Sequence, residues 1–365
     1  MKKIIALLLS LTLVMSMLVA CGKKEATDKK ADPTAAPTSA PAAEDKKDNT
    51  ANDTAAPAAA KTGLAVVTSL TSSKNATEDA DGTAQIDSTV AAVLVGQDGK
   101  ILKCSIDVAQ TKVKFSKDGK LLTDLATAFQ SKQELKEAYG MKKASGIGKE
   151  WNEQADAFEA YVIGKTIDQV KGIALGEDGK ATEADLTSSV TVHINEFIEA
   201  VEKAVAGAQD LGAKEGDKLG LAIVTNIAKS KDATAEAAGL AQAYSYYTAT
   251  TVAADGKISS CIIDASQGNV NFDATGVITT DLTVAPQTKQ ELKEAYNMKK
   301  ASGIGKEWYE QANAFAAYVT GKTVAEVDGI AMTDGVPSVA DLTSSVTVHA
   351  TDFVTAIDKA VATAE

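Results

Sequence analysis

The chain has 365 residues with a net charge of −12 and no arginine, and 45% of its residues are apolar. That length allows about two globular domains. An acidic chain without arginine lacks the basic surface and the forked side chain on which nucleic-acid binding usually depends, so nucleic acid is excluded as a partner. Two histidines and three cysteines are too few for a zinc framework or a disulfide scaffold, and no metal site is expected.

The first 20 residues have the features of an export signal. Two lysines precede an apolar run from Ile4 to Met17, and small residues lead up to Cys21. The stretch Leu18–Cys21 resembles the bacterial lipobox, which implies that the signal peptide 1–20 is removed and that Cys21 carries a lipid. An uncleaved anchor is the alternative, but the apolar run is shorter than the roughly 20 residues that span a bilayer. The protein is therefore expected to be lipid-anchored at the cell surface, on the outer face of the bacterial cytoplasmic membrane.

Residues 21–61 are expected to form a disordered tether. The segment is rich in Ala, Thr, Asp and Lys, contains four of the six prolines and has no aromatic residue. Such a composition cannot bury enough apolar surface to fold. A flexible coil of this length would hold the folded part about 35 Å from the membrane.

The remainder of the chain is a duplication. Two segments recur, the first with one change and the second with none: Lys132 to Trp151 as Lys289 to Trp308, and Asp185 to His193 as Asp341 to His349. The period of about 157 residues is too long for a solenoid, whose units measure roughly 20–50 residues. Two whole domains are therefore predicted, over residues 62–210 and 211–365.

Each unit changes from strand periodicity to helix periodicity along its length. The β-rich runs 89–95 and 101–108 flank an Asp-Gly turn and predict a hairpin. The apolar residues of 151–162 and of 194–205 fall at helical spacing, and a short β-branched strand is predicted at 189–193. Together these elements predict an α+β fold of two tandem homologous domains, each an antiparallel sheet with packed helices.

Cys104 and its counterpart Cys261 lie on the apolar face of the second hairpin strand of each unit. They are therefore interpreted as small buried residues, with a reactive thiol as the alternative. The lysine-rich segment 132–149 is interpreted as a solvated helix face, with a docking site as the alternative.

Several catalytic arrangements find no support, and no catalytic residue is predicted. Ser188 and His193 lie close in sequence, but no nucleophile-elbow glycines surround the serine. The segment 146–149 lacks the first glycine and the Ser or Thr of a phosphate-binding P-loop. Paired glycosidase carboxylates cannot be identified by spacing among 49 acidic residues.

The sequence Asp-Leu-Thr-Ser-Ser-Val-Thr stands before the last helix of each unit, and it resembles the signature of the FMN-binding domain family. This family includes the exported subunits of sodium-pumping quinone reductases and Rnf complexes, and flavin-bearing surface lipoproteins. Its members carry Asp-x-x-Ser-Gly-Ala-Thr, and a flavin transferase joins the FMN phosphate to the hydroxyl of the final threonine. The matching positions are Asp185, Ser188 and Thr191 in the first unit and Asp341, Ser344 and Thr347 in the second, with Ser-Val at the Gly-Ala positions.

The resemblance implies covalent FMN at Thr191 and Thr347. A Gly-x-Gly ahead of a helix also matches loosely and could bring backbone N–H groups close to a phosphate; its glycines are Gly146 and Gly148 in the first unit and Gly303 and Gly305 in the second. Lys142, Lys143 and Lys149 are the nearest cations in the first unit. In an extended segment His193 would share a face with Thr191, the alternative being a solvent-facing histidine.

The function implied is that of a membrane-anchored extracytoplasmic lipoprotein that carries FMN and relays electrons to an unidentified redox partner. A covalent link would keep the cofactor at an exported site where free FMN is lost. Whether such a relay is an enzyme is left open. The alternative is a cofactor-free surface lipoprotein that acts as a binding or structural module, in which the motif is only a Thr/Ser-rich edge strand.

Overall fold

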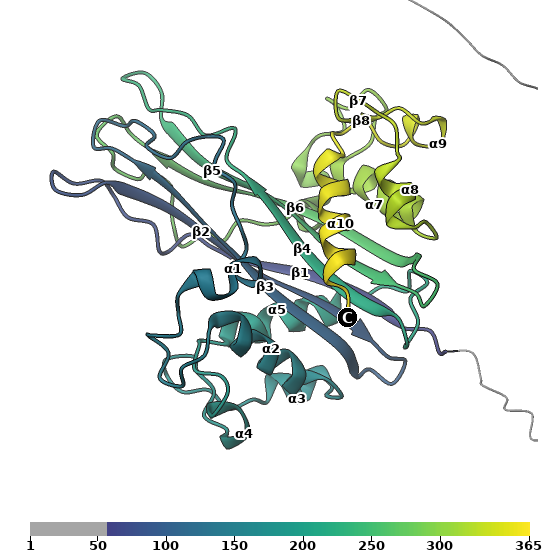
Figure 1. Cartoon of the computed structure of the whole chain (residues 1–365). Helices are drawn as coiled ribbons and strands as arrows, with labels where there is room; N and C mark the ends of the chain where they lie inside the picture. The colour runs from purple at the N-terminus through teal and green to yellow at the C-terminus, as the bar shows by residue number, and fades with distance from the viewer. Residues whose placement is uncertain (1–56) are drawn as a thin grey trace, which may run out of the picture. The chain divides into compact units, whose positions relative to one another are not determined.

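The computed structural model describes residues 57–365, which belong to one compact unit (Figure 1). The signal segment, Cys21 and most of the predicted tether lie outside the described residues. Within residues 57–365, no helix combines the length and the apolar character needed to cross a membrane.

The two copies, residues 62–210 and 211–365, share the order of a three-stranded meander followed by helices, and the second copy has an additional two-stranded hairpin among its helices. The first copy contains β1 (Lys61–Ser69), β2 (Gly82–Val95), β3 (Ile101–Phe115), α1 (Lys132–Leu135), η1 (Lys136–Tyr139), α2 (Trp151–Val162), α3 (Ile167–Lys171), α4 (Ala184–Thr187) and α5 (Asn195–Ala206). The second contains β4 (Lys218–Asn226), β5 (Gly239–Val252), β6 (Ile258–Phe272), α6 (Lys289–Leu292), η2 (Lys293–Tyr296), α7 (Trp308–Val319), α8 (Val324–Asp328), β7 (Met332–Thr333), β8 (Val336–Pro337), α9 (Ala340–Thr343) and α10 (Thr351–Thr363).

Each copy builds an antiparallel sheet whose strands lie in chain order, β1-β2-β3 and β4-β5-β6. The predicted hairpin is present as β2 and β3, with a register shift at Leu94 and Val95 beside the turn. The predicted helices are present as α2 and α5. The α+β class, with two repeated antiparallel sheets and packed helices, is therefore confirmed.

The two sheets pack against each other, and this explains why the ends of β2 and β5 are buried on both faces. In β2, Val90, Ala92 and Leu94 belong to a core shared with the second sheet, whereas Ala91 and Val93 belong to the core under the first copy's own helices. Successive side chains of a strand point to opposite faces, so alternate residues of one strand serve two cores. The layers run helices, sheet, sheet, helices (Figure 1).

Reciprocal contacts at the far end of the sheets show that the copies are related by an approximate two-fold axis. The rings of Phe115 and Phe272 stack with centroids 4.2 Å apart and planes within 5°. The amide of Ala76 donates to the carbonyl of Gly276 at 2.9 Å, and that of Ala233 donates to Gly119 at 2.8 Å. Equivalent residues thus exchange equivalent bonds, as in an isologous dimer interface.

The outer helices sit on their sheets at very close range. Gly63 of β1 faces the carbonyl oxygen of Ala204 in α5, and Gly220 of β4 faces that of Ala360 in α10. A Cβ on either glycine would overlap that oxygen. The glycines therefore allow the helix backbone to rest directly on the strand.

The strand predicted at 189–193 is wrong. The amides of Ser189 and Val190 bond to the carbonyl of Leu186 in a turn that follows α4, and those of Thr191 and Val192 bond to a side chain of α2. A single bridge between Lys180 and His193 is the strand pairing recorded for this segment. Tertiary hydrogen bonds have overridden the β preference of the branched residues.

Replacement of Gly220 by alanine tests the close packing of α10 on β4. The added methyl group must push the helix off the strand, so Gly220→Ala is expected to lower the free energy of unfolding by about 3 kcal/mol in urea denaturation. Gly216→Ala is the control, because a Cβ there meets no atom within 4 Å. Equal effects of the two substitutions would contradict this account.

Candidate functional site

The largest of the cavities described lies on the helical side of the first copy and has a volume of about 820 Å³. We call it the outer cavity. Three of the sequence-predicted residues line it, Gly146, Thr191 and His193, although Gly146 is far from the other two along the chain. The wall also contains the aromatic rings of Tyr139, Trp151 and Phe197, the cations Lys132 and Lys180, and the carboxylates Asp87 and Glu196.

The other predicted residues of the first copy lie beside the outer cavity and outside its lining. Asp185 is exposed on α4, and Ser188 is exposed in the turn that ends this helix. Gly148 has a φ of +65° and closes the turn after Ser145. Lys142, Lys143 and Lys149 are not among the lining residues, and the cations of the wall are Lys132 and Lys180.

Gln154, a fully buried residue of α2, holds the two parts of the motif together. Its Oε1 accepts hydrogen bonds from the amide and hydroxyl of Thr191, at 2.8 and 3.1 Å, and from the amide of Val192 at 3.2 Å. Its Nε2 lies 3.2 Å from both the Ser145 hydroxyl and the Lys149 carbonyl oxygen. The position of Thr191 relative to the glycine loop is therefore set by one buried amide.

Sequence reasoning missed this glutamine. Its position lies on the apolar stripe of the helix, three residues after Trp151 and four before Phe158, where a polar residue is uncommon. The second copy has Gln311 at the same place. A polar residue retained on a buried stripe in both copies was the available signal.

Charged groups of both signs surround the outer cavity. The Lys132 Nζ lies over the rings of Tyr139 and Trp151, 4.9 and 5.2 Å from their centroids. One oxygen of the Asp87 carboxylate accepts a hydrogen bond from the side-chain amide of Gln85 at 2.7 Å. The other oxygen is buried and has no hydrogen-bond partner among the described residues. A half-buried carboxylate with unused hydrogen-bonding capacity favours a ligand that carries a donor.

The same framework recurs around Thr347. Gln311 is fully buried, and its Oε1 accepts from the Thr347 amide at 2.7 Å and from its hydroxyl at 3.2 Å. The other predicted residues of this copy are exposed: Asp341 in the first turn of α9, Ser344 at its C-terminal end, and Gly303 and Gly305 in the loop before α7.

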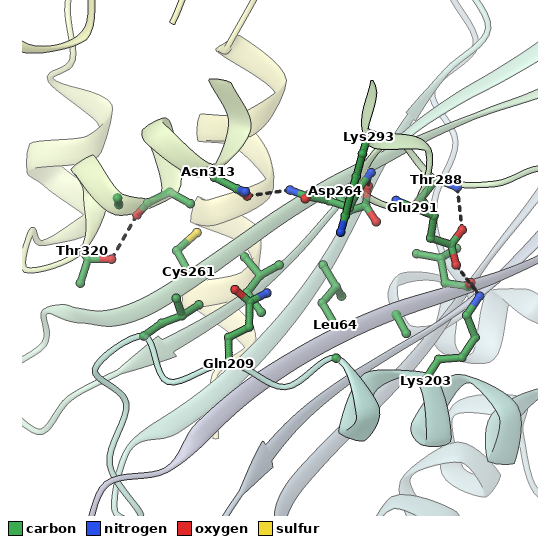
Figure 2. A pocket seen from close by; sticks show the side chains of 18 residues that line it. Leu64, Lys203, Gln209, Cys261, Asp264, Thr288, Glu291, Lys293, Asn313 and Thr320 are labelled. Atoms are coloured by element: carbon green, nitrogen blue, oxygen red, sulfur yellow. Dashed lines mark hydrogen bonds and ion pairs between the residues drawn. The ribbon is translucent and has the colours of Figure 1, made fainter. Parts of the chain in front are cut away.

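Two further pockets lie between the copies and are related by the approximate two-fold axis. One, of about 520 Å³, is lined by β1 and α5 of the first copy and by β6, α6 and α7 of the second. Figure 2 shows Lys203 reaching across it to Glu291, at 2.6 Å. The side-chain amide of Gln290 donates to the side-chain oxygen of Asn313 at 2.7 Å. The backbone amide of Gln290 donates to the Asp264 carboxylate at 3.0 Å. These polar groups already bond to one another, and among them the pair Lys203 and Glu291 links the two copies.

The related pocket, of about 670 Å³, is more acidic because Asp156 and Glu159 replace Asn313 and Ala316. Burial raises the pKa of Glu159 to about 8, although its carboxylate accepts from the Ile106 amide at 2.6 Å. Burial likewise raises the pKa of Asp107 to about 6. These carboxyls hold protons in the folded state at pH values where an exposed carboxyl is ionised.

Both cysteines of the described part are free and buried, as expected of small core residues. Burial raises the pKa of the Cys261 thiol to about 11 and also raises that of Cys104. Neither thiol is activated as a nucleophile. Residues 57–365 contain no group of three or more Asp, Glu, His or Cys side chains arranged to hold a metal ion.

The buried carboxyl of Glu159 should make stability depend on pH. Between its ordinary pKa of 4.5 and its folded pKa of about 8, the folded state keeps a proton that the unfolded chain has lost. The free energy of unfolding should therefore fall as the pH rises through this window. Glu159→Gln should flatten the decline between pH 5 and 9 by roughly 4 kcal/mol, because the shift acts over about three pH units within this range and one pKa unit corresponds to about 1.4 kcal/mol. Urea unfolding at pH 5 and pH 9 measures the effect. Glu137→Gln, at an exposed position, is the control. If the free energy of unfolding of Glu159→Gln fell with pH as steeply as that of the wild type, the assignment of the proton to Glu159 would be wrong.

Comparison with known proteins identifies no family for this chain. No family model matches it, and no solved structure matches it. A segment of 41 residues is 54% identical to a chlorophenol reductase of Desulfitobacterium hafniense. The match covers 11% of this chain and 12% of that protein, so it shows similarity of a short segment alone.

Proposed function

We propose that the first copy carries FMN in the outer cavity, joined through its phosphate to Thr191, and that the chain relays electrons outside the cytoplasmic membrane. The observation that carries the proposal is the meeting of Thr191, Gly146 and three aromatic side chains in one cavity. The threonine and the glycine are the residues that the resemblance to the FMN-binding domain family singled out. The lipid anchor and the transfer of electrons to a partner are inferred from the sequence resemblances alone.

The outer cavity suits a planar ligand with a charged tail. Ligand sites measure roughly 300–1,000 Å³ and combine an apolar wall with a few polar groups. The rings of Tyr139, Trp151 and Phe197 provide the apolar wall. Lys132 provides positive charge for a phosphate, whereas Lys180 is paired with Asp178 at 2.9 Å. A bound flavin would supply reversible electron transfer, and the protein would supply position and electrostatics.

Thr191 is suited to be the attachment point because its hydroxyl lies at the cavity wall on a fixed backbone. The side chain is half-buried, and both its amide and the next one are held by Gln154. An ester at the hydroxyl would give up only the 3.1 Å bond to Gln154 and leave the two backbone bonds in place. Gly146 is exposed, and a Cβ there would meet no atom within 4 Å, so the loop is open at this residue.

Co-expression of the full chain with a flavin transferase, which would break the pyrophosphate bond of FAD, join FMN to the threonine oxygen and release AMP and the hydroxyl proton, tests the proposal. Intact mass should show one added FMN on the wild type, and peptide mapping should place it on Thr191. Thr191→Ala should lose the addition completely, whereas Thr191→Ser, which keeps a hydroxyl, should retain it. Thr187→Ala, on an exposed position of α4, is the matched control and should carry FMN like the wild type.

The competing function, a cofactor-free binding or structural lipoprotein, predicts the opposite result. The wild type would then show no added mass and no flavin absorbance after co-expression. That outcome would overturn the electron-carrier proposal and leave the outer cavity as a site for a ligand of another kind.

A further inference from the structure

The two copies share the framework of the site and differ in one wall. The Thr191 and Thr347 segments, the glycine loops and the glutamines Gln154 and Gln311 make equivalent hydrogen bonds. On the central strand, however, Asp87 and Thr89 of β2 are replaced by Tyr244 and Tyr246 of β5. Tyr244 pairs with Asn226 just as Asp87 pairs with Ser69, so the substitutions fall at equivalent places in the sheets.

The two tyrosines occupy the second copy's counterpart of the outer cavity. Their rings stack with centroids 4.7 Å apart, and the ring of Tyr246 packs edge-on against Phe353 of α10 at 5.7 Å. Phe353 is the counterpart of Phe197, which lines the outer cavity in the first copy. Tyr246 is 7% exposed, so the place of the small Thr89 is filled by a buried ring.

A lysine completes this filling. Lys289 is 2% exposed, donates to the Tyr244 hydroxyl, and lies 4.4 Å from the centroids of the Tyr244 and Tyr296 rings and 4.8 Å from that of Trp308. Its counterpart Lys132 is half-buried and lines the open cavity. The cation therefore sits inside an aromatic cage in the second copy and at an accessible wall in the first.

We infer that Tyr244, Tyr246 and Lys289 form an internal plug, so that the chain holds one ligand, in the first copy, and that the residue pair at positions 87 and 89 decides whether a copy binds. This inference rests on the proposed function for the identity of the ligand. The openness of the two sites does not depend on the ligand and can be measured by itself. Thr347 then remains unmodified, although its motif is identical to that of Thr191.

Two reciprocal double variants test the plug. Asp87→Tyr/Thr89→Tyr copies the plug into the first copy and should reduce the FMN found by intact mass from one per chain to none. Tyr244→Asp/Tyr246→Thr removes it from the second copy and should raise the number to two, the second on Thr347. Circular dichroism and a cooperative thermal transition show that each variant is folded. Wild type bearing FMN on Thr347, or a folded opened variant that still carries one FMN, would overturn the inference.

Acetylation of lysine by an N-hydroxysuccinimide ester measures the difference in access between the two sites without any flavin. The unprotonated amine displaces N-hydroxysuccinimide and forms an amide, so the rate at each lysine depends on its access and on its pKa, and peptide mapping identifies the site. Burial lowers the pKa of Lys289 to about 7, which by itself would speed the reaction, so a slow reaction at Lys289 reports lack of access. In the wild type Lys132 should react and Lys289 should be protected. In the opened variant, Tyr244→Asp/Tyr246→Thr, Lys289 should approach the rate of Lys132. In the closed variant, Asp87→Tyr/Thr89→Tyr, Lys132 should become protected.

The two measurements separate the two proposals. Absence of FMN from every variant, with lysine labelling as expected, would refute the FMN assignment and support the plug. Equal labelling of Lys132 and Lys289 in the wild type, or continued protection of Lys289 in the opened variant, would refute the plug whatever the flavin content.

Discussion

The packing of one sheet on the other is the constraint on which the rest of the structure depends. A three-stranded sheet has two faces, and helices from its own copy cover one of them. The other face carries Val90, Ala92 and Leu94 in the first copy, and these residues share a buried core with residues of the second copy that include Leu221 and Tyr247. Neither sheet could keep that face in water at low cost, since burial of apolar surface is the main favourable term in folding. The two copies of the repeat thus form one structural unit.

This arrangement leaves the helical sides free to carry sites, one on each side of the double sheet. The buried amide of Gln154 or Gln311 ties the motif threonine to the glycine loop in each copy. A side chain that satisfies several backbone groups at once in a low-dielectric interior imposes a geometry that surface contacts cannot impose. The threonine hydroxyl therefore has a defined position in each copy.

Local pattern predicted much of the fold and less of the site. The hairpin, the helices from Trp151 and from Asn195, and the buried cysteines follow from alternation, helical spacing and an Asp-Gly turn, which act over a few residues. The strand predicted at 189–193 is absent because the amides of Thr191 and Val192 bond to Gln154, a residue distant in sequence. The contact between the sheets could not be predicted from the sequence either. A strand that is buried on both faces has the same apolar run whether helices or a second sheet cover it.

The retention of the segment from Lys132 to Trp151 in both copies has a structural explanation that does not need a ligand. Glu150 and its counterpart Glu307 accept from the amide nine residues earlier, at 2.8 Å in both copies, and each is capped in turn by a glutamate three residues later. These bonds tie the loop to the start of the core helix, so a change in the loop would disturb the fold of either copy. Positions 87 and 89 bear no such bonds to the loop and are free to change. The wall of the outer cavity can therefore differ between the copies while both keep the same framework.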